Sequence, residues 1–237
     1  MTAPGTSRVL CFGDSNTYGI VPGERARYAA GVRWPGVLQQ LLGAGHDVVE
    51  EGLPGRTTDL EDTILGRPGR AGLGYFTACV DSHLPLDVIV LMLGTNDLRT
   101  RYARTPDDVA RALGRYLDHP AGSAAALGLP VPRFVVVAPP PMDGTAERFV
   151  ASMPAPGVYD AASAAASRRL AGPLRALAAA GGHAFLDAAP ITRTGIDGCH
   201  LDADSHRRLA GALAPVVRDL AAGQASPSPV VDPPTGS

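Results

Sequence analysis

The chain contains no lysine, because all 21 of its basic residues are arginine. Without a lysine amine it has no residue for a Schiff base, no anchor for pyridoxal phosphate and no phosphate-binding G-K-[ST] loop. Cysteine is also scarce: Cys11, Cys79 and Cys199 lack C-x-x-C spacing, which argues against a disulfide framework or a zinc knuckle. No apolar run reaches the length of a membrane span and no secretory signal is evident. We therefore expect a reduced, cytoplasmic protein with no membrane partner.

Strong net charge is absent as well. The formal charge is −2 and the pI is about 6.3, which argues against a general nucleic-acid-binding role. Of the 237 residues, 45% are hydrophobic, enough for the core of one domain. We expect a loose N-terminal leader over 1–7, one domain over 8–222, and a disordered tail over 223–237, where proline and serine are frequent.

Short β-branched runs alternate with stretches of helical character through the body of the chain. The predicted strands are 9–12, 47–50, 88–93, 134–138 and 184–186, and the predicted helices are 33–42, 106–117, 158–180 and 204–222. Pro173 is expected to kink or split the third of these helices. Such alternation predicts an α/β fold in which helices cover both faces of a five-stranded parallel sheet. Ligands bind beyond the carboxyl ends of the strands in these sheets.

Unusual residues follow three of the predicted strands. Ser15 comes directly after the first strand, Gly55 follows the second, and Asn96 follows the third. A serine there is exposed at the ligand face, a glycine can offer its backbone N–H, and an asparagine can offer an amide donor to an oxyanion. Taken singly, each could equally be a helix cap or a turn residue.

Asp197 and His200 follow the last predicted strand. A carboxylate three residues before a histidine can accept from Nδ1–H and leave Nε2 to take a proton from a serine, although a lone D-x-x-H could also be a surface loop. Asp187 is a competing carboxylate that we assign a structural role. If the interpretation is right, the Ser15 hydroxyl lies within hydrogen-bond reach of His200.

Together these segments resemble the GDSL or SGNH hydrolase superfamily, and most of all its bacterial arylesterases and acyltransferases. The matching motifs are F-G-D-S-N at 12–16, E-G-L-P-G-R-T-T at 51–58, G-T-N-D at 94–97 and D-G-C-H-L at 197–201. The resemblance implies a flavodoxin-like three-layer sandwich. It also implies Ser15 as nucleophile, His200 as base, Asp197 as its partner, and Ser15, Gly55 and Asn96 as oxyanion donors.

Two residues depart from the family pattern: Asn16 stands in place of leucine, and Cys199 in place of an aliphatic residue. Segment 139–157 aligns least well and is expected to border the substrate pocket. Trp34 is expected either at the mouth of the site or in the core, and Arg56 in a structural salt bridge. A metal site at His200 and His206 with Asp202 and Asp204 is disfavoured, since the two carboxylates are better explained as the start of the last helix.

The sequence therefore predicts a serine esterase that hydrolyses small aryl or short-acyl esters through an acyl-enzyme, without cofactor or metal. Acyl transfer to an alcohol and thioester hydrolysis use the same residues and stay open, as does a non-catalytic, flavodoxin-like binding module. The expected partner is a small ester, and the resemblance implies a homo-oligomer. The polar stretch 21–32 is long enough to reach over the site or across to another subunit.

Overall fold

A single parallel sheet organises the chain in the computed structural model, which describes residues 5–63, 66–149 and 158–223. The strands lie in the order β2-β1-β3-β4-β5, and every neighbouring pair is parallel. Their bounds are β1 Ser7–Gly13, β2 His46–Gly52, β3 Val88–Met92, β4 Arg133–Ala138 and β5 Ala184–Asp187. This confirms the five-stranded parallel α/β fold expected from the sequence.

Alternate residues of the central strands enter two separate hydrophobic clusters, one on each face of the sheet. In β1, Leu10 and Phe12 belong to one cluster, while Val9 and Cys11 belong to the other. All four side chains are fully buried. Since side chains alternate between faces along a strand, a strand that is apolar at every position must be covered on both sides.

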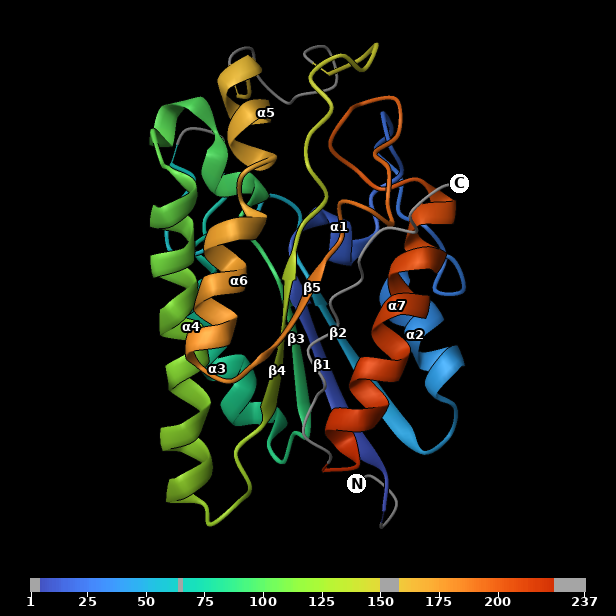
Figure 1. The fold of residues 1–237 in the computed structure, drawn as a ribbon, viewed down its shortest axis with the longest axis vertical. Coiled ribbons are helices and arrows are strands. Elements are labelled where there is room, and N and C mark those ends of the chain that lie inside the picture. Colours follow the sequence, from blue (N-terminus) through green and yellow to red (C-terminus); the bar gives the residue numbers. More distant parts are fainter. Residues whose placement is uncertain (1–4, 64–65, 150–157, 224–237) are drawn as a thin grey trace, which may run out of the picture.

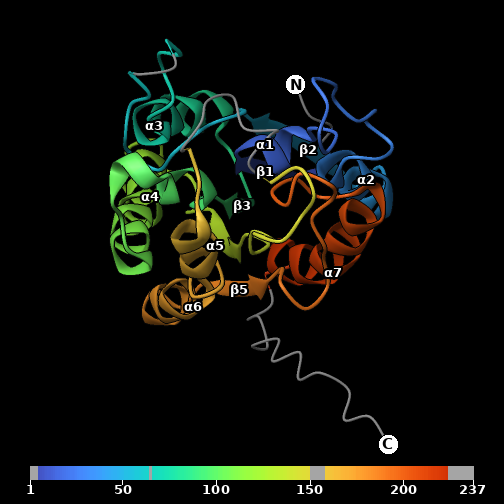
Figure 2. The ribbon, with the colours of Figure 1, turned by 90° about the horizontal axis from the view of Figure 1, so that it is seen from above.

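Helices provide that cover in two layers (Figure 1, Figure 2). α2 (Trp34–Leu42) and α7 (Ala203–Ala221) pack on one face. α3 (Gly72–His83), α4 (Pro106–Ala126) and α6 (Ala171–Ala180) pack on the other, with the short α5 (Ala161–Ser167) above them. No helix of the described residues is both long enough and apolar enough to cross a membrane.

The site of interest lies where the direction of strand succession reverses, between β1 and β3. α1 (Ser15–Tyr18) follows β1 there, and two short 3₁₀ turns, η1 (Thr95–Leu98) and η2 (Thr100–Tyr102), follow β3. In an open α/β sheet this switch point leaves a crevice that neighbouring helices do not cover. The topology thus places the segments after β1 and β3 beside each other.

Several expected boundaries need correction. Strand β1 starts at Ser7, inside the expected leader. α3 was not predicted, and α4 continues past Pro120 to Ala126 instead of ending at residue 117. The expected helix 158–180 is split, but the break lies between α5 and α6, and Pro173 stands in the first turn of α6. A first-turn proline costs little because its missing N–H would have no partner inside the helix. The expected tail lies almost wholly outside the described residues.

Candidate active site

Ser15 is the first residue of α1, at the end of a turn that only glycine can enter. A Cβ on Gly13 would lie 2.0 Å from Thr17 Oγ1 and 2.7 Å from the Met92 carbonyl oxygen. Asp14 caps the helix, since its Oδ1 accepts from the Asn16 N–H at 2.9 Å. Ser15, which follows this turn, lines a cavity of about 930 Å³.

Asp197 and His200 form a hydrogen-bonded pair on the wall of the same cavity. His200 Nδ1 lies 2.7 Å from Asp197 Oδ2. Asp197 also accepts from the backbone N–H groups of Gly23, Cys199 and His200 at 2.8–3.0 Å. The hydrogen bond and charge of His200, followed by these backbone donors, outweigh burial and hold the pKa of Asp197 well below its usual range. An ionised Asp197 fixes the proton on Nδ1 and leaves Nε2 as the free basic atom.

Asn16 ties the nucleophile turn to the loop that carries His200. Its Nδ2 donates to the Cys199 carbonyl at 3.1 Å, and its Oδ1 accepts from the Leu201 N–H at 2.9 Å. The Asn16 amide thereby holds the backbone on both sides of His200, although 185 residues separate Asn16 from Leu201. Among the described contacts no hydrogen bond joins Ser15 to His200, contrary to expectation. Such catalytic bonds often close only around a substrate.

The side chain of Asn96, in η1, has all but one of its hydrogen-bonding positions occupied by protein groups. Its Oδ1 accepts from Arg99 Nη2 at 2.7 Å and from the Tyr159 hydroxyl at 3.1 Å. Its Nδ2 donates to Asp14 Oδ2 at 3.3 Å. Because two donors point at one amide atom, that atom must be the oxygen Oδ1 and the other the nitrogen Nδ2. One N–H of Nδ2 remains for a ligand in the cavity.

Gly55 lines the same cavity as Asp197 and His200 and has a φ of +83°, a conformation that favours glycine. Within the described part of the chain, the backbone N–H groups of Ser15 and Gly55 have no protein acceptor. With the Asn96 amide they supply the three donors expected for an oxyanion. All five predicted site residues therefore line one cavity.

The buried Asp97 joins the Gly55 loop to η1. It accepts from the Thr58 N–H at 3.0 Å and pairs with Arg104 at 3.2 Å. Burial raises its pKa to about 6, although the bonds from Thr58 and the charge of Arg104 lower it. Burial likewise raises the pKa of Asp14 to about 6. Asp97 thus connects the Gly55 loop to η1, and Asp14 connects the turn before Ser15 to Asn96.

The expectations for other residues around the site have different outcomes. Arg56 is structural, but in the described chain it forms no salt bridge: it donates to the Gly13 carbonyl at 2.8 Å and stacks on the Phe12 ring. Trp34 is fully buried in the α2–α7 layer, so it belongs to the core. Tyr18, in α1, is among the residues that line the cavity. Asp187 accepts from the Ala189 N–H, the structural role expected of it.

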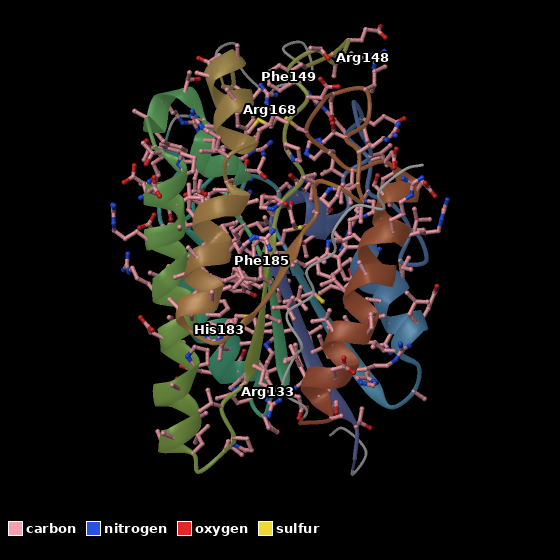
Figure 3. The ribbon with its side chains drawn as sticks, viewed as in Figure 1. Arg133, Arg148, Phe149, Arg168, His183 and Phe185 are labelled. Atoms are coloured by element: carbon pink, nitrogen blue, oxygen red, sulfur yellow. The ribbon has the colours of Figure 1, made fainter. Side chains whose placement is uncertain are left out.

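The loop after β4 packs against the segment that carries Asp197. The Asp143 N–H donates to the Gly198 carbonyl at 2.8 Å, and the Arg148 N–H to the Ile196 carbonyl at 3.0 Å. Figure 3 shows Arg148 and Phe149 at the carboxyl end of the sheet and Arg133 at the opposite end. Residues 139–149 thus contact the segment next to Asp197, but none of them lines the cavity, so their expected place at the substrate pocket stays a prediction; 150–157 lie outside the described residues.

Metal-ligating groups are sparse among the described residues. Asp202 caps α7 by accepting from the Ser205 N–H at 2.7 Å, as the sequence analysis expected, and His206 Nδ1 accepts from the Trp34 N–H at 3.1 Å. Glu51, Cys79 and His83 form the one described group with ligand atoms within 4.8 Å of one another. His83 Nδ1 lies 2.8 Å from the Cys79 carbonyl, so that nitrogen is already engaged.

Sequence reasoning missed three residues of this site: Asn16, Arg99 and Tyr159. Asn16 was noted only as a departure from a family pattern. Arg99 directly follows the G-T-N-D-L segment, so a basic residue three positions after Asn96 was the one available signal. Tyr159 meets Asn96 across 63 residues and carries no local pattern.

Comparison with known proteins gives a family and a set of related structures. Residues 11–222 match the model of the GDSL-like lipase/acylhydrolase family. The structure of an aryl esterase from M. smegmatis is 39% identical, with a TM-score of 0.81, covering 91% of this chain and all of that one. Est24, a carbohydrate acetylesterase from Sinorhizobium meliloti, is 36% identical, with a TM-score of 0.80 and the same coverage. No curated protein matches the chain. The chain belongs to the GDSL-like lipase/acylhydrolase family and is a carboxylic ester hydrolase.

Proposed function

We propose that the chain hydrolyses small carboxylic esters through an acyl-enzyme on Ser15, with Asp197 and His200 completing the triad. The observation that carries this assignment is the 2.7 Å pair between Asp197 and His200 Nδ1 on the wall of the cavity that Ser15 also lines. A carboxylate that fixes the imidazole tautomer makes Nε2 a base for a nearby hydroxyl.

The reaction runs in two halves. His200 Nε2 takes the Ser15 proton while Oγ bonds to the ester carbonyl carbon, and the carbonyl oxygen becomes an oxyanion. The backbone N–H groups of Ser15 and Gly55 and the Asn96 amide stabilise that charge. The bond to the alcohol then breaks, and the alcohol leaves with the proton from His200. Water, deprotonated by His200, attacks the acyl group and frees Ser15 as the acid departs.

Small substrates are supported by the relatives. One similar structure is that of an aryl esterase and another that of a carbohydrate acetylesterase. One name gives an aryl ester and the other an acetyl ester, and we assign small esters of these two kinds to this chain. Polar groups cover much of the cavity wall, which suits short acyl chains better than long apolar ones.

The test is hydrolysis of p-nitrophenyl acetate by the wild type and by Ser15→Ala. Loss of the nucleophile is expected to lower kcat by at least about 10³-fold. Ser82→Ala, on the outer face of α3, is the matched control and is expected to keep wild-type turnover. Undiminished turnover in Ser15→Ala would overturn the assignment.

A further inference from the structure

Arginine dominates the charged groups around the cavity. Arg25, Arg27, Arg67, Arg70 and Arg99 line it, against two carboxylates, Glu24 and Asp197. Asp197 is already engaged by His200 Nδ1 and by three backbone N–H groups. The wall is therefore cationic, although the whole chain has a net charge of −2. A cleft lined by one sign of charge concentrates ligands of the opposite sign.

Some of these arginines have carboxylate partners and others do not. Arg27 pairs with Glu50 at 3.3 Å, and Arg99 with Asp62 at 2.8 Å. In the part of the chain that the structure describes, Arg70 makes no ion pair; its Nη1 donates to the Pro68 carbonyl at 3.1 Å, and its buried Nε has no partner. The carboxylates whose charges act on Arg70 are Asp62 and Glu61, and Asp62 is shared between Arg99 and Arg101. Arg70 therefore keeps donor capacity for a ligand.

Arg70 also lies beside the proposed oxyanion donors. Because Gly55 has no side chain, Arg70 Nε comes within 3.7 Å, and Arg99 Nη2 within 3.2 Å, of the point where a Cβ on Gly55 would lie. A ligand bound to the Gly55 N–H therefore lies next to two guanidinium groups. Burial, followed by the charge of Arg67, lowers the pKa of Arg70 from its usual value, but a guanidinium stays protonated at neutral pH.

We propose that the preferred substrates are esters that carry an anionic group, a carboxylate or a similar oxyanion, and that Arg70 binds this group. The proposal rests on the proposed ester hydrolysis at Ser15. Arginine suits the role because its planar fork can make two parallel hydrogen bonds to a carboxylate. The anion lies on either the acyl or the alcohol part of the ester, and the experiment distinguishes the two. The alternative is that the cationic wall only stabilises the oxyanion of the reaction. In that case kcat/KM would be similar for neutral and anionic esters.

The experiment compares matched esters at low ionic strength. The acyl arm uses p-nitrophenyl hemiglutarate against p-nitrophenyl pentanoate; the alcohol arm uses 4-acetoxybenzoate against 4-acetoxybenzamide. We expect kcat/KM to be about 10-fold higher for the anionic member of at least one arm, through KM, with the preference shrinking as salt is raised. The salt series uses the wild type, so it is independent of any folding defect in a variant.

Arg70→Gln is expected to bring the anionic-to-neutral ratio in that arm close to 1. Arg111→Gln, on the exposed face of α4, is the matched control and is expected to keep the wild-type ratio. A ratio of 1 or less in both arms, or a ratio that persists in Arg70→Gln, would overturn the proposal. Hydrolysis of the neutral esters that depends on Ser15 would still stand in that case. If the wild type hydrolysed none of the neutral esters, that result would count against the proposed function itself.

Discussion

We expect Asn16 to position His200, the proposed catalytic base, through the backbone on both sides of it. Asn16 bonds the carbonyl of Cys199 and the N–H of Leu201, the residues on either side of His200. Asn16→Leu keeps the branched side-chain shape and leaves both backbone groups unpaired. We expect kcat to fall about 10- to 100-fold with little change in KM, since a shift of about 1 Å in a catalytic group can cost that much. Steady-state kinetics on p-nitrophenyl acetate measure the split.

Thr17→Val is the matched control for that variant. Thr17 follows Asn16 in the same short helix, is fully buried, and has a hydroxyl without a hydrogen-bond partner in the described residues. Its replacement is expected to leave kcat near the wild-type value. Equal losses of kcat in both variants would mean that the helix is sensitive to any substitution. Asn16 would then have no specific role in positioning His200.

At the scale of single residues, the sequence identified the groups with a chemical signature. Ser15, Asn96 and His200 stand in short motifs after strands, and parallel strands bring those motifs to one edge. Asn16 and Tyr159 could not be found that way, because their partners are distant in sequence and polar contacts of this kind leave no periodic pattern. For Arg56 a salt bridge was expected, whereas burial pairs it with carbonyl oxygens and an aromatic face.

The α2–α7 interface holds a titratable group that links stability to pH. His206 is fully buried and accepts the Trp34 N–H at Nδ1. Burial, opposed by the charge of Asp202, lowers its pKa from 6.5 to about 4. The unfolded chain therefore binds the proton first, and the folded state loses stability as pH falls from about 6.5 to about 4. The opposite sign applies to Asp14 and Asp97 in that window, since their raised pKa values favour the folded state as pH falls.

His206→Asn isolates the histidine contribution, because asparagine can still accept the Trp34 N–H and does not titrate in this range. Urea unfolding at pH 7.5 and pH 4.5 measures the difference. We expect the variant to lose less free energy of unfolding on acidification than the wild type, by on the order of 3 kcal/mol. His119→Asn, on α4, is the control. An identical loss in the wild type and in His206→Asn would show that the buried imidazole does not govern acid sensitivity.

Elements were predictable where pattern and capping agree. α4 begins at a Thr105 capping box followed by Pro106, both visible in the sequence. α3 has an N-cap without a side-chain hydrogen bond and includes Gly72 and Gly74, so nothing local marks it as a helix. Its packing beside α4 stabilises it instead. α4 passes Pro120 because that residue and Ala124 are buried, and tertiary contacts offset the lost backbone bond.

For the whole molecule, two cores share one sheet. Leu113 on α4 and Leu213 on α7 lie on opposite faces, and both are buried. Since β1, β3 and β4 contribute to both clusters, unfolding of these strands removes the packing surface of both helical layers. We therefore propose that residues 8–222 unfold as one cooperative domain. Leu113→Ala and Leu213→Ala are each expected to cost about 2–5 kcal/mol and to shift a single transition.

Two probes report on the two faces during unfolding. Fluorescence of Trp34, the one tryptophan, follows the α2–α7 layer, while far-ultraviolet circular dichroism follows all helices. Coincident transitions in both variants are expected. Leu127→Ala, at a side chain that is 62% exposed, is the control and is expected to change the free energy of unfolding by less than about 0.5 kcal/mol. If Leu113→Ala left the tryptophan transition in place while shifting the dichroism, the layers would unfold separately. The switch-point site, which draws on loops after four of the strands, would then depend on two domains instead of one.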